Sequence, residues 1–490
     1  MSFGQIFRDA LAGYGDRVAI VGDREQISYA DVLRQSDNIA GHFLKLGLKA
    51  GDRIGIALQD SVDVILSVVA CWRIAATPMT IDFRAPRSQR ARNSKDFGLA
   101  AILETRNMPG DDLYPNVLFS KSWRTDFTAS QQEPVDCSNP AFLMLSSGTT
   151  GEPKAYVQSH EALAGRVVSR KTVLAGTAKR FLSPMTLSYS ATRHQYLGYL
   201  YLGGTVRCFS PLFTPSELID ALIGFKASGT ALPPPVIARL VREVGASGTR
   251  RLPDLDVLYS VGGPARAEDK IGAYRHLSPG YRISYASSLT GVISALSGPD
   301  VLAKPESSGR PVQNARVDIL DPQGRPLGIG EAGLIKAWTQ TMASSVLAPG
   351  NKPFVDPSIM GEGWGIPGDI GFVDEDGFLT IVDREADMIV RGGVNIAPQE
   401  LEKLIRSHPG VLDVAVAGFP DEVMGQEIAA FVVSETVTID DLRTFLRAHV
   451  APDRRPREIR LVKSLPFNDN GKLLRRKLVE DLVKDVTPAT

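Results

Sequence analysis

Short apolar runs alternate with amphipathic segments over the first 380 residues of the chain. Residues 53–58 (RIGIAL) predict a buried strand, and helical spacing of apolar residues follows over 63–75. Residues 204–209 (GTVRCF) predict another strand before a helical segment over 214–225, where Thr214 is placed to cap the helix. This alternation predicts an α/β fold with layered sheets and helices and largely buried strands.

Beyond about residue 384 the pattern is that of a smaller unit. Three helical segments (398–408, one capped by Thr438, and 472–484) and three β-like runs (412–419, 427–433, 458–462) lie there. About a hundred residues suffice for a small α+β domain. We therefore predict a large N-terminal domain over residues 1–384 and a small C-terminal domain over residues 385–490.

Composition narrows the class of protein. Lys plus Arg and Asp plus Glu number 55 each, so overall charge favours neither nucleic acid nor an anionic membrane as a partner. Cys71, Cys137 and Cys208 lie far apart and form neither a disulfide framework nor a metal knuckle. The longest apolar run, 64–72, is too short to span a bilayer. We expect a cytoplasmic protein without nucleic-acid or membrane partners.

Residues 145–155 (LSSGTTGEPKA) have the chemistry of a phosphate-binding loop. Gly148 and Gly151 permit tight turns that aim successive N–H groups at one point, and Lys154 adds a positive charge. The spacing of a Walker A loop is absent. By itself, the segment also fits a plain Gly/Ser turn between two strands.

Further motifs follow in a definite order. They are SVGGP (260–264), GRP (309–311), GWGIPGD (363–369), DREADMIVRGGVNIAPQELE (383–402) and LPFNDNGKLLRRKL (465–478). Together with SSGTTGEPK, they make nearly the whole chain resemble the adenylate-forming (ANL) superfamily, that is, the acyl-CoA synthetase or AMP-dependent synthetase and ligase family. In that family, the large domain carries ATP and acid, and the small mobile domain rotates between half-reactions.

The resemblance implies activation of a carboxylic acid by ATP to an acyl-adenylate, followed by transfer to a thiol, with ATP, Mg²⁺ and coenzyme A as cofactors. Lys472 would be catalytic, neutralising charge between the carboxylate and the α-phosphate. The β- and γ-phosphates would be held by Ser146, Ser147, Gly148, Thr149, Thr150, Gly151 and Lys154. AMP would contact Gly262, Gly263, Pro264, Tyr285, Ala286, Ser287, Ser288, Asp369 and Arg384, with Asp369 accepting hydrogen bonds from the ribose hydroxyls.

The chain departs from the family pattern at residues 284–291 (SYASSLTG). Leu289 stands where the family has a Glu that helps to bind Mg²⁺, and leucine has no oxygen to offer a hard cation. Either phosphates, water and the 149–150 hydroxyls hold the metal, or the protein is a degenerate nucleotide- or acyl-adenylate-binding protein. We expect no protein metal ligand of the usual kind. On sequence alone, a large gain in adenylation on Leu289→Glu would indicate degeneracy.

Two other positions depart from the pattern. Ala386 replaces a polar hinge residue, and Leu187 replaces a common His, with His194 the nearest imidazole. Ser188 matches a position where amino-acid-activating relatives place an Asp. Because a buried ammonium group needs a charged partner, an α-amino acid is disfavoured as the substrate.

The acid pocket predicted from these motifs favours an aryl or a short or medium acyl acid. Its residues are Ser188, Tyr189, Ser260 and Gly262, which fit packing or turn positions equally well. Gly392 and Gly393 match a loop that lines the thiol passage in coenzyme A ligases, although they also fit a plain hairpin turn. Coenzyme A is the expected acceptor, with a separate carrier protein or an amine as alternatives. The acid itself and the oligomeric state stay open, a homodimer included.

Overall fold

The computed structural model describes the 490 residues except 107–112, 127–134, 146–153, 169–178, 246–249, 355–358, 362, 468–472 and 487–490. The chain divides into two compact units. The first comprises residues 1–316 and 337–365, and the second comprises residues 317–336 and 366–490. Residues 366–384, predicted from the sequence to lie in the large domain, therefore belong by their contacts to the second unit. The functional boundary at Arg384 stays a prediction.

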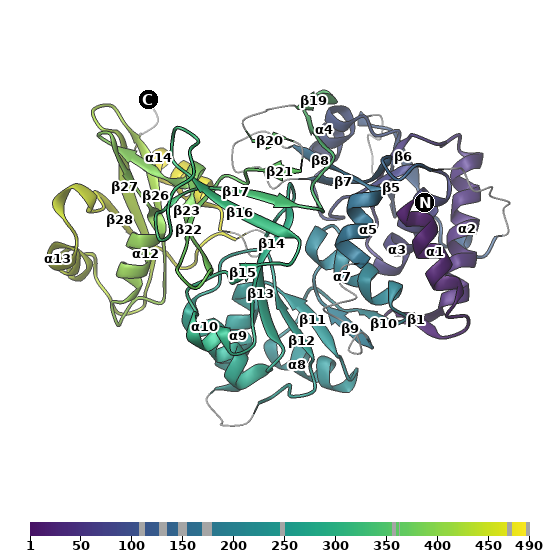
Figure 1. Ribbon diagram of the computed structural model, residues 1–490, viewed down its shortest axis with the longest axis horizontal. Coiled ribbons are helices and arrows are strands. Elements are labelled where there is room, and N and C mark those ends of the chain that lie inside the picture. The colour runs from purple at the N-terminus through teal and green to yellow at the C-terminus, as the bar shows by residue number, and fades with distance from the viewer. Residues whose placement is uncertain are drawn as a thin grey trace. The chain divides into compact units, whose positions relative to one another are not determined.

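A large sheet in the first unit has the strand order β15-β14-β13-β12-β11-β9-β10-β1-β2 (Figure 1). Its strands are β1 (Val18–Val21), β2 (Gln26–Ser28), β9 (Arg180–Ser183), β10 (Thr205–Cys208), β11 (Gly229–Leu232), β12 (Val257–Ser260), β13 (Tyr281–Ser287), β14 (Gly291–Ser297) and β15 (Arg310–Pro311). From β13 to β1 the neighbouring strands are parallel. Their carboxyl ends consequently share one edge of the sheet.

Smaller sheets complete the β layers of this unit. A parallel sheet has the order β4-β3-β5-β6, and an antiparallel sheet has the order β19-β18-β8-β7. The strands are β3 (Arg53–Ala57), β4 (Thr77–Thr80), β5 (Ala101–Glu104), β6 (Asn116–Leu118), β7 (Pro140–Leu145), β8 (Ala155–Ser159), β18 (Ser345–Ala348) and β19 (Lys352–Phe354). Strands β7 and β8 flank the predicted phosphate loop.

Helices pack beside these sheets. In the first unit they are α1 (Phe3–Ala12), α2 (Tyr29–Lys45), α3 (Ser61–Arg73), α4 (Arg87–Phe97), α5 (His160–Val168), α7 (Ser190–Tyr201), α8 (Pro215–Gly224), α9 (Pro234–Val244), α10 (Ala267–Gly272) and α11 (Asp300–Ala303). The predicted capping box at Thr214 is present in α8. None of the described helices has the length and apolarity that a membrane span requires.

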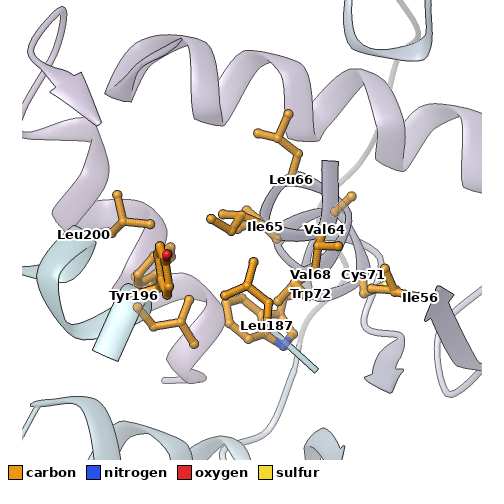
Figure 2. Packing of buried hydrophobic residues seen from close by; sticks show 14 of the residues in the cluster. Ile56, Val64, Ile65, Leu66, Val68, Cys71, Trp72, Leu187, Tyr196 and Leu200 are labelled. Atoms are coloured by element: carbon orange, nitrogen blue, oxygen red, sulfur yellow. The ribbon is translucent and has the colours of Figure 1, made fainter. Parts of the chain in front are cut away.

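The core of the first unit gathers around α3, which is buried from Val62 to Trp72. The Trp72 ring makes edge contacts with Phe3, Phe7 and Phe142, at centroid distances of 5.4, 5.9 and 5.9 Å. Figure 2 shows part of this cluster, in which Leu187 lies with α3 side chains. Aromatic contacts of this kind add to the stabilisation from burial, so α3 is a rigid support for its neighbours.

The strands near the unit boundary are β16 (Ala315–Leu320), β17 (Gly333–Thr339), β20 (Met360–Gly361), β21 (Trp364–Gly365), β22 (Asp369–Val373) and β23 (Leu379–Arg384). In the first unit, Ala337 and Trp338 of β17 pair with β21, which also pairs with β20. In the second unit, Gly333 and Leu334 of β17 pair with β22, which forms a hairpin with β23.

The rest of the second unit is a sheet with the order β25-β24-β27-β26 and β28 paired to β27. Its elements are β24 (Ile389–Arg391), β25 (Val394–Ile396), α12 (Pro398–Arg406), β26 (Asp413–Asp421), β27 (Gly425–Val433), α13 (Ile439–His449), β28 (Glu458–Leu461) and α14 (Arg475–Val486). Apolar residues of α12, α13, β26 and β27 form one core. The predicted architecture, a large layered α/β region followed by an α+β region, is confirmed.

Candidate functional site

The fold brings three predicted segments to one edge of the large sheet. Residue Ser260 ends β12, residues 285–287 end β13, and β9 leads into the segment with Ser188 and Tyr189. Strand β11 lies between β12 and β9 and is parallel to both. Because ligands in open parallel sheets bind beyond the carboxyl ends of the strands, this edge is a candidate site for nucleotide and acid.

The turn after β12 has the backbone conformation that its sequence requires. Ser260 is fully buried, whereas Gly262 is exposed and has a φ of +100°, which favours glycine. Gly263 and Pro264 continue the turn. The strand therefore ends in a stretch of backbone that a flat ring could approach closely, as the predicted adenine contact requires.

The segment after β13 is held in place by hydrogen bonds. The Ser287 hydroxyl accepts from the Thr290 N–H at 3.0 Å. Arg166 of α5 donates from Nη2 to the Ser288 carbonyl at 3.1 Å and from Nε to the Thr341 carbonyl at 2.9 Å. The backbone at Ser288 is thus fixed by an arginine that the sequence motifs did not indicate. Only the three-dimensional pairing of α5 with this loop reveals it.

Leu289 lies inside an apolar cluster and not in a polar cleft. It is 3% exposed and packs with Ala343 and Val346, and with the partly buried Tyr156, Met342 and Met360. A Cβ atom added at Gly365 would lie only 2.8 Å from a Leu289 methyl group, so the cluster is tight. Leu289 is a packing residue here.

No carboxylate therefore reaches the metal position through residue 289. Among the described residues, no group of three or more His, Cys, Asp or Glu side chains is arranged to hold a metal ion. Mg²⁺ commonly keeps several waters and relies on substrate phosphates, so an ion bound to ATP would not need a carboxylate at residue 289.

The predicted acid-pocket segment lies directly before α7. The Ser188 hydroxyl shares a hydrogen bond with the Thr186 hydroxyl at 2.7 Å. Burial raises the pKa of Tyr189 to about 12, so its phenol stays neutral at physiological pH. Neither side chain carries a charge that would select an ammonium group.

Leu187 and His194 are both buried in the first unit. Leu187 is 4% exposed and packs in the core with Val68 and Trp72 of α3 (Figure 2). His194 is equally buried, and its Nε2 lies 3.3 Å from Oε1 of Gln158 on β8. The position that the family commonly fills with His is thus part of the hydrophobic core in this chain.

In the second unit, Asp369 and Arg384 are cross-strand partners in the β22–β23 hairpin. Arg384 Nε lies 3.0 Å from Asp369 Oδ1, and Asp369 is 5% exposed. The two residues predicted to bind nucleotide are therefore an ion pair that orients the Asp369 carboxylate. The sequence placed them fifteen residues apart and did not indicate this contact.

Asp383, next to Arg384, is a buried acid that the motifs did not single out. Its carboxylate accepts from the backbone N–H of Gln399 in the first turn of α12 at 3.0 Å, and from that of Arg384 at 2.8 Å. Burial nevertheless raises its pKa to about 6. Asp383 joins the β23 strand to the helix after the predicted hinge, and Ala386 lies between them in a short turn, Glu385–Asp387.

Gly392 and Gly393 form the turn of the β24–β25 hairpin. Their φ angles are +57° and +84°, and positive values at both central residues are typical of a type I′ turn. The Gly392 N–H donates to the Met424 carbonyl at 2.9 Å, and a Cβ atom on Gly392 would lie 2.7 Å from Met424 Cε. The hairpin interpretation is confirmed, and the thiol-passage role stays a prediction.

Some predicted residues lie outside the described part of the chain. They are Ser146, Ser147, Gly148, Thr149, Thr150, Gly151 and Lys472. Lys154 is described and leads directly into β8. Ala286 is exposed near the end of β13, between Tyr285 and Ser287.

Comparison with known proteins identifies the family of this chain. The sequence profile of AMP-binding enzymes matches residues 7–346, and that of the AMP-binding enzyme C-terminal domain matches residues 400–472. The chain belongs to the AMP-binding enzyme family. It is 29% identical to an uncharacterized acyl–CoA ligase of Bacillus subtilis strain 168, YhfT, over 96% of each protein. It is 30% identical to peroxisomal OPC-8:0-CoA ligase 1 of Arabidopsis thaliana, over 93% of this chain and 88% of the relative.

Solved structures agree with the fold. The o-succinylbenzoate CoA synthetase MenE from Bacillus subtilis, in complex with the acyl-adenylate intermediate OSB-AMP, has a TM-score of 0.85 at 22% identity. The match covers 96% of this chain and 97% of that one. The fold of this AMP-binding enzyme is thus similar to that of the o-succinylbenzoate CoA synthetase over nearly the full length of both chains.

Proposed function

We propose that this AMP-binding enzyme activates a non-amino carboxylic acid with ATP and transfers the acyl group to coenzyme A. The observation that carries the proposal is the meeting of the 260–264 turn, the 285–288 segment and the 188–189 segment at one sheet edge. The named CoA ligases among its relatives support a thiol as the acceptor.

In the first step, an oxygen of the substrate carboxylate attacks the α-phosphorus of MgATP. The bond between the α-phosphorus and the bridging oxygen breaks, and pyrophosphate leaves with the electron pair. Lys472 would neutralise charge as the transition state forms, and the 146–151 loop with Lys154 would hold the departing phosphates. The turn Gly262–Pro264 and residues 285–288 would hold AMP, and Asp369, which is ion-paired to Arg384, would accept hydrogen bonds from the ribose hydroxyls.

In the second step, the thiol sulfur attacks the acyl carbonyl carbon, and AMP leaves as the carbon–oxygen bond breaks. We propose that Gly392 and Gly393 line the path of the thiol, and that residues 385–490 rotate against residues 1–384 between the two steps. The acid itself would lie beside Ser188, Tyr189, Ser260 and Gly262. We further expect small-molecule substrates without a nucleic-acid or membrane partner, and a cytoplasmic location; the oligomeric state stays open, a homodimer included.

Acid-dependent exchange of labelled pyrophosphate into ATP tests the first step. Aryl and aliphatic acids are supplied in turn, and AMP release with and without coenzyme A then tests the second step. Lys472→Ala should abolish acid-dependent exchange, whereas Lys477→Ala, at an exposed lysine of α14, should not. Measurable ATP binding without exchange for any acid would instead indicate a degenerate nucleotide-binding protein. Acid-dependent exchange without any thioester would point to a carrier protein or an amine as the acceptor.

A further inference from the structure

Arg193 is a buried arginine in the first turn of α7. It is 3% exposed, and its guanidinium carbon lies 4.1 Å from the centroid of the Phe142 ring. Its Nη1 donates to the Thr80 hydroxyl at 2.7 Å and to the Leu187 carbonyl at 3.2 Å. One corner of the guanidinium is therefore held firmly by neutral oxygens and an aromatic face.

The other nitrogens of this guanidinium have no hydrogen-bond acceptor among the described residues. Neither Nε nor Nη2 has a hydrogen-bond partner there, and no carboxylate forms an ion pair with Arg193 within that part of the chain. Burial, with a smaller effect of the positive charge on Arg166, lowers the pKa of Arg193 to about 9. Proteins pair buried charges because an unpaired one is costly, so this environment favours an anion from outside the chain.

A second unused donor lies on the face of the β7–β8 hairpin against which Arg193 packs. Gln158 on β8 is the cross-strand partner of Phe142 on β7, so both side chains emerge on the same face of the hairpin. Gln158 is fully buried, and its Oε1 is engaged by His194, whereas its Nε2 has no partner among the described residues. Within the described part of the chain, Nε and Nη2 of Arg193 and Nε2 of Gln158 have no acceptors, and such N–H groups are suited to a carboxylate.

This donor pair adjoins the predicted acid pocket. Nη1 of Arg193 also lies 3.5 Å from the carbonyl of Ser188, the first residue of the pocket segment. On β7, Met144 lies on the same face as Phe142, and its sulfur accepts from the Ser190 hydroxyl at 3.4 Å and from Arg166 at 3.8 Å.

Arg166 in turn donates to the Ser288 carbonyl. Residues in contact therefore connect the segment predicted to hold the α-phosphate with Arg193. An acid that reacts near Ser288 and passes Tyr189 would bring its far end toward the two unused donors. The family motifs did not single out any residue of this donor pair.

We propose that Arg193 and Gln158 bind a second carboxylate of the substrate, so that the enzyme prefers dicarboxylic acids. One carboxylate reacts with ATP, and the other stays ionised against the guanidinium and the Gln158 amide. The absence of an acid at Ser188 agrees with this, because the pocket would then select a negative and not a positive substituent. This inference rests on the proposed function.

The unmodified enzyme gives the first test. Pyrophosphate exchange is measured with matched sets of acids: dicarboxylic acids, their half-esters and the corresponding monocarboxylic acids, in aliphatic and aryl series. We expect kcat/KM for the best dicarboxylic acid to exceed that of its half-ester by roughly 10–100-fold, as expected for charge-assisted hydrogen bonds. Half-esters or monocarboxylic acids that match or exceed the dicarboxylic acids would overturn the proposal.

Variants test the donors themselves. Arg193→Met and Gln158→Met should bring the ratio of kcat/KM between diacid and half-ester toward one. The control is Gln195→Met, because Gln195 is also 2% exposed with an unpartnered Nε2 but lies two residues further along α7, away from Arg193. Gln195→Met should keep the ratio. If Arg193→Met leaves the ratio unchanged, the inference is wrong.

Thermal unfolding with diacid but without ATP separates the two proposals. The diacid should raise the Tm of the unmodified protein and not that of Arg193→Met, whether or not exchange occurs. A Tm shift without exchange would support the carboxylate site and contradict the proposed reaction. Exchange with monocarboxylic acids, without a diacid-dependent Tm shift, would support the proposed reaction and contradict the carboxylate site. Arg193→Met also removes the hydrogen bonds to Thr80 and Leu187, so its Tm is compared with that of Gln158→Met, which keeps them. A large loss of Tm in Arg193→Met, with an unchanged ratio in Gln158→Met, would indicate a structural arginine and count against the site.

Discussion

Replacing Leu289 by Glu is expected to destabilise the enzyme without making it a better one. Leu289 is 3% exposed among Ala343, Val346 and Met342, with no room around Gly365. Deleting a buried leucine side chain usually costs about 2–5 kcal/mol. A carboxyl group without partners in the same place adds about 1–3 kcal/mol. We therefore expect Leu289→Glu to lower the free energy of unfolding by about 3–8 kcal/mol.

Urea unfolding followed by tryptophan fluorescence measures this loss, with pyrophosphate exchange recorded in parallel. Leu289→Met is the matched control, since a change between hydrophobic side chains of similar volume usually costs less than about 1.5 kcal/mol. A Glu variant that unfolds within about 1 kcal/mol of the unmodified protein and exchanges tenfold faster would refute this reasoning. It would mean that residue 289 faces the metal and that the native chain is a degenerate enzyme.

Other predictions concern the second unit. Asp369→Asn should weaken ATP binding roughly 10–100-fold, measured by calorimetry, because it removes a charged acceptor, while Asp376→Asn in the exposed turn of the same hairpin should have little effect. Gly392→Ala, at φ +57° and against a close neighbour, should slow thioester formation relative to pyrophosphate exchange. Gly393→Ala is the control for backbone strain. Its φ of +84° is also unfavourable for alanine, but its added Cβ atom would lie in open space, without the close contact found at Gly392. The raised pKa of Asp383, about 6 against 3.8 for an ordinary Asp, contributes stability that is full below about pH 4 and lost as pH rises through 6. The unfolding free energy of the unmodified protein relative to Asp383→Asn should thus fall by up to about 3 kcal/mol across that window and be constant above it; a flat difference from pH 4 to 7 would contradict the assignment.

Much of the fold followed from local patterns. Apolar runs and caps indicated the strands and helices, including the capping box at Thr214, because these signals act within a few residues. The glycine pair 392–393 likewise indicated a hairpin, since two positive φ angles in succession favour glycine. Ordered motifs then indicated the family and the segments that meet at the edge of the large sheet.

The contacts that give those segments their chemistry depend on pairings between distant residues. Nothing near Leu289 in the sequence shows that its side chain packs on Ala343 and Val346 instead of facing a metal. The sequence also cannot show that Gln158 and Phe142 share one face, because that depends on strand register. The sequence gives no sign of a role for Arg193, because its burial against Phe142 appears only when α7, β4 and β7 come together.

Oxygen transfer tests the central claim most directly. The preferred acid is labelled with ¹⁸O in the reacting carboxyl group and incubated with MgATP, coenzyme A and the enzyme, and the AMP is analysed by mass spectrometry. Formation of an acyl-adenylate predicts one ¹⁸O atom in the phosphate of each AMP molecule, because the carboxylate oxygen that attacks phosphorus leaves with AMP. Unlabelled AMP, or release of ADP and phosphate in its place, would contradict the account.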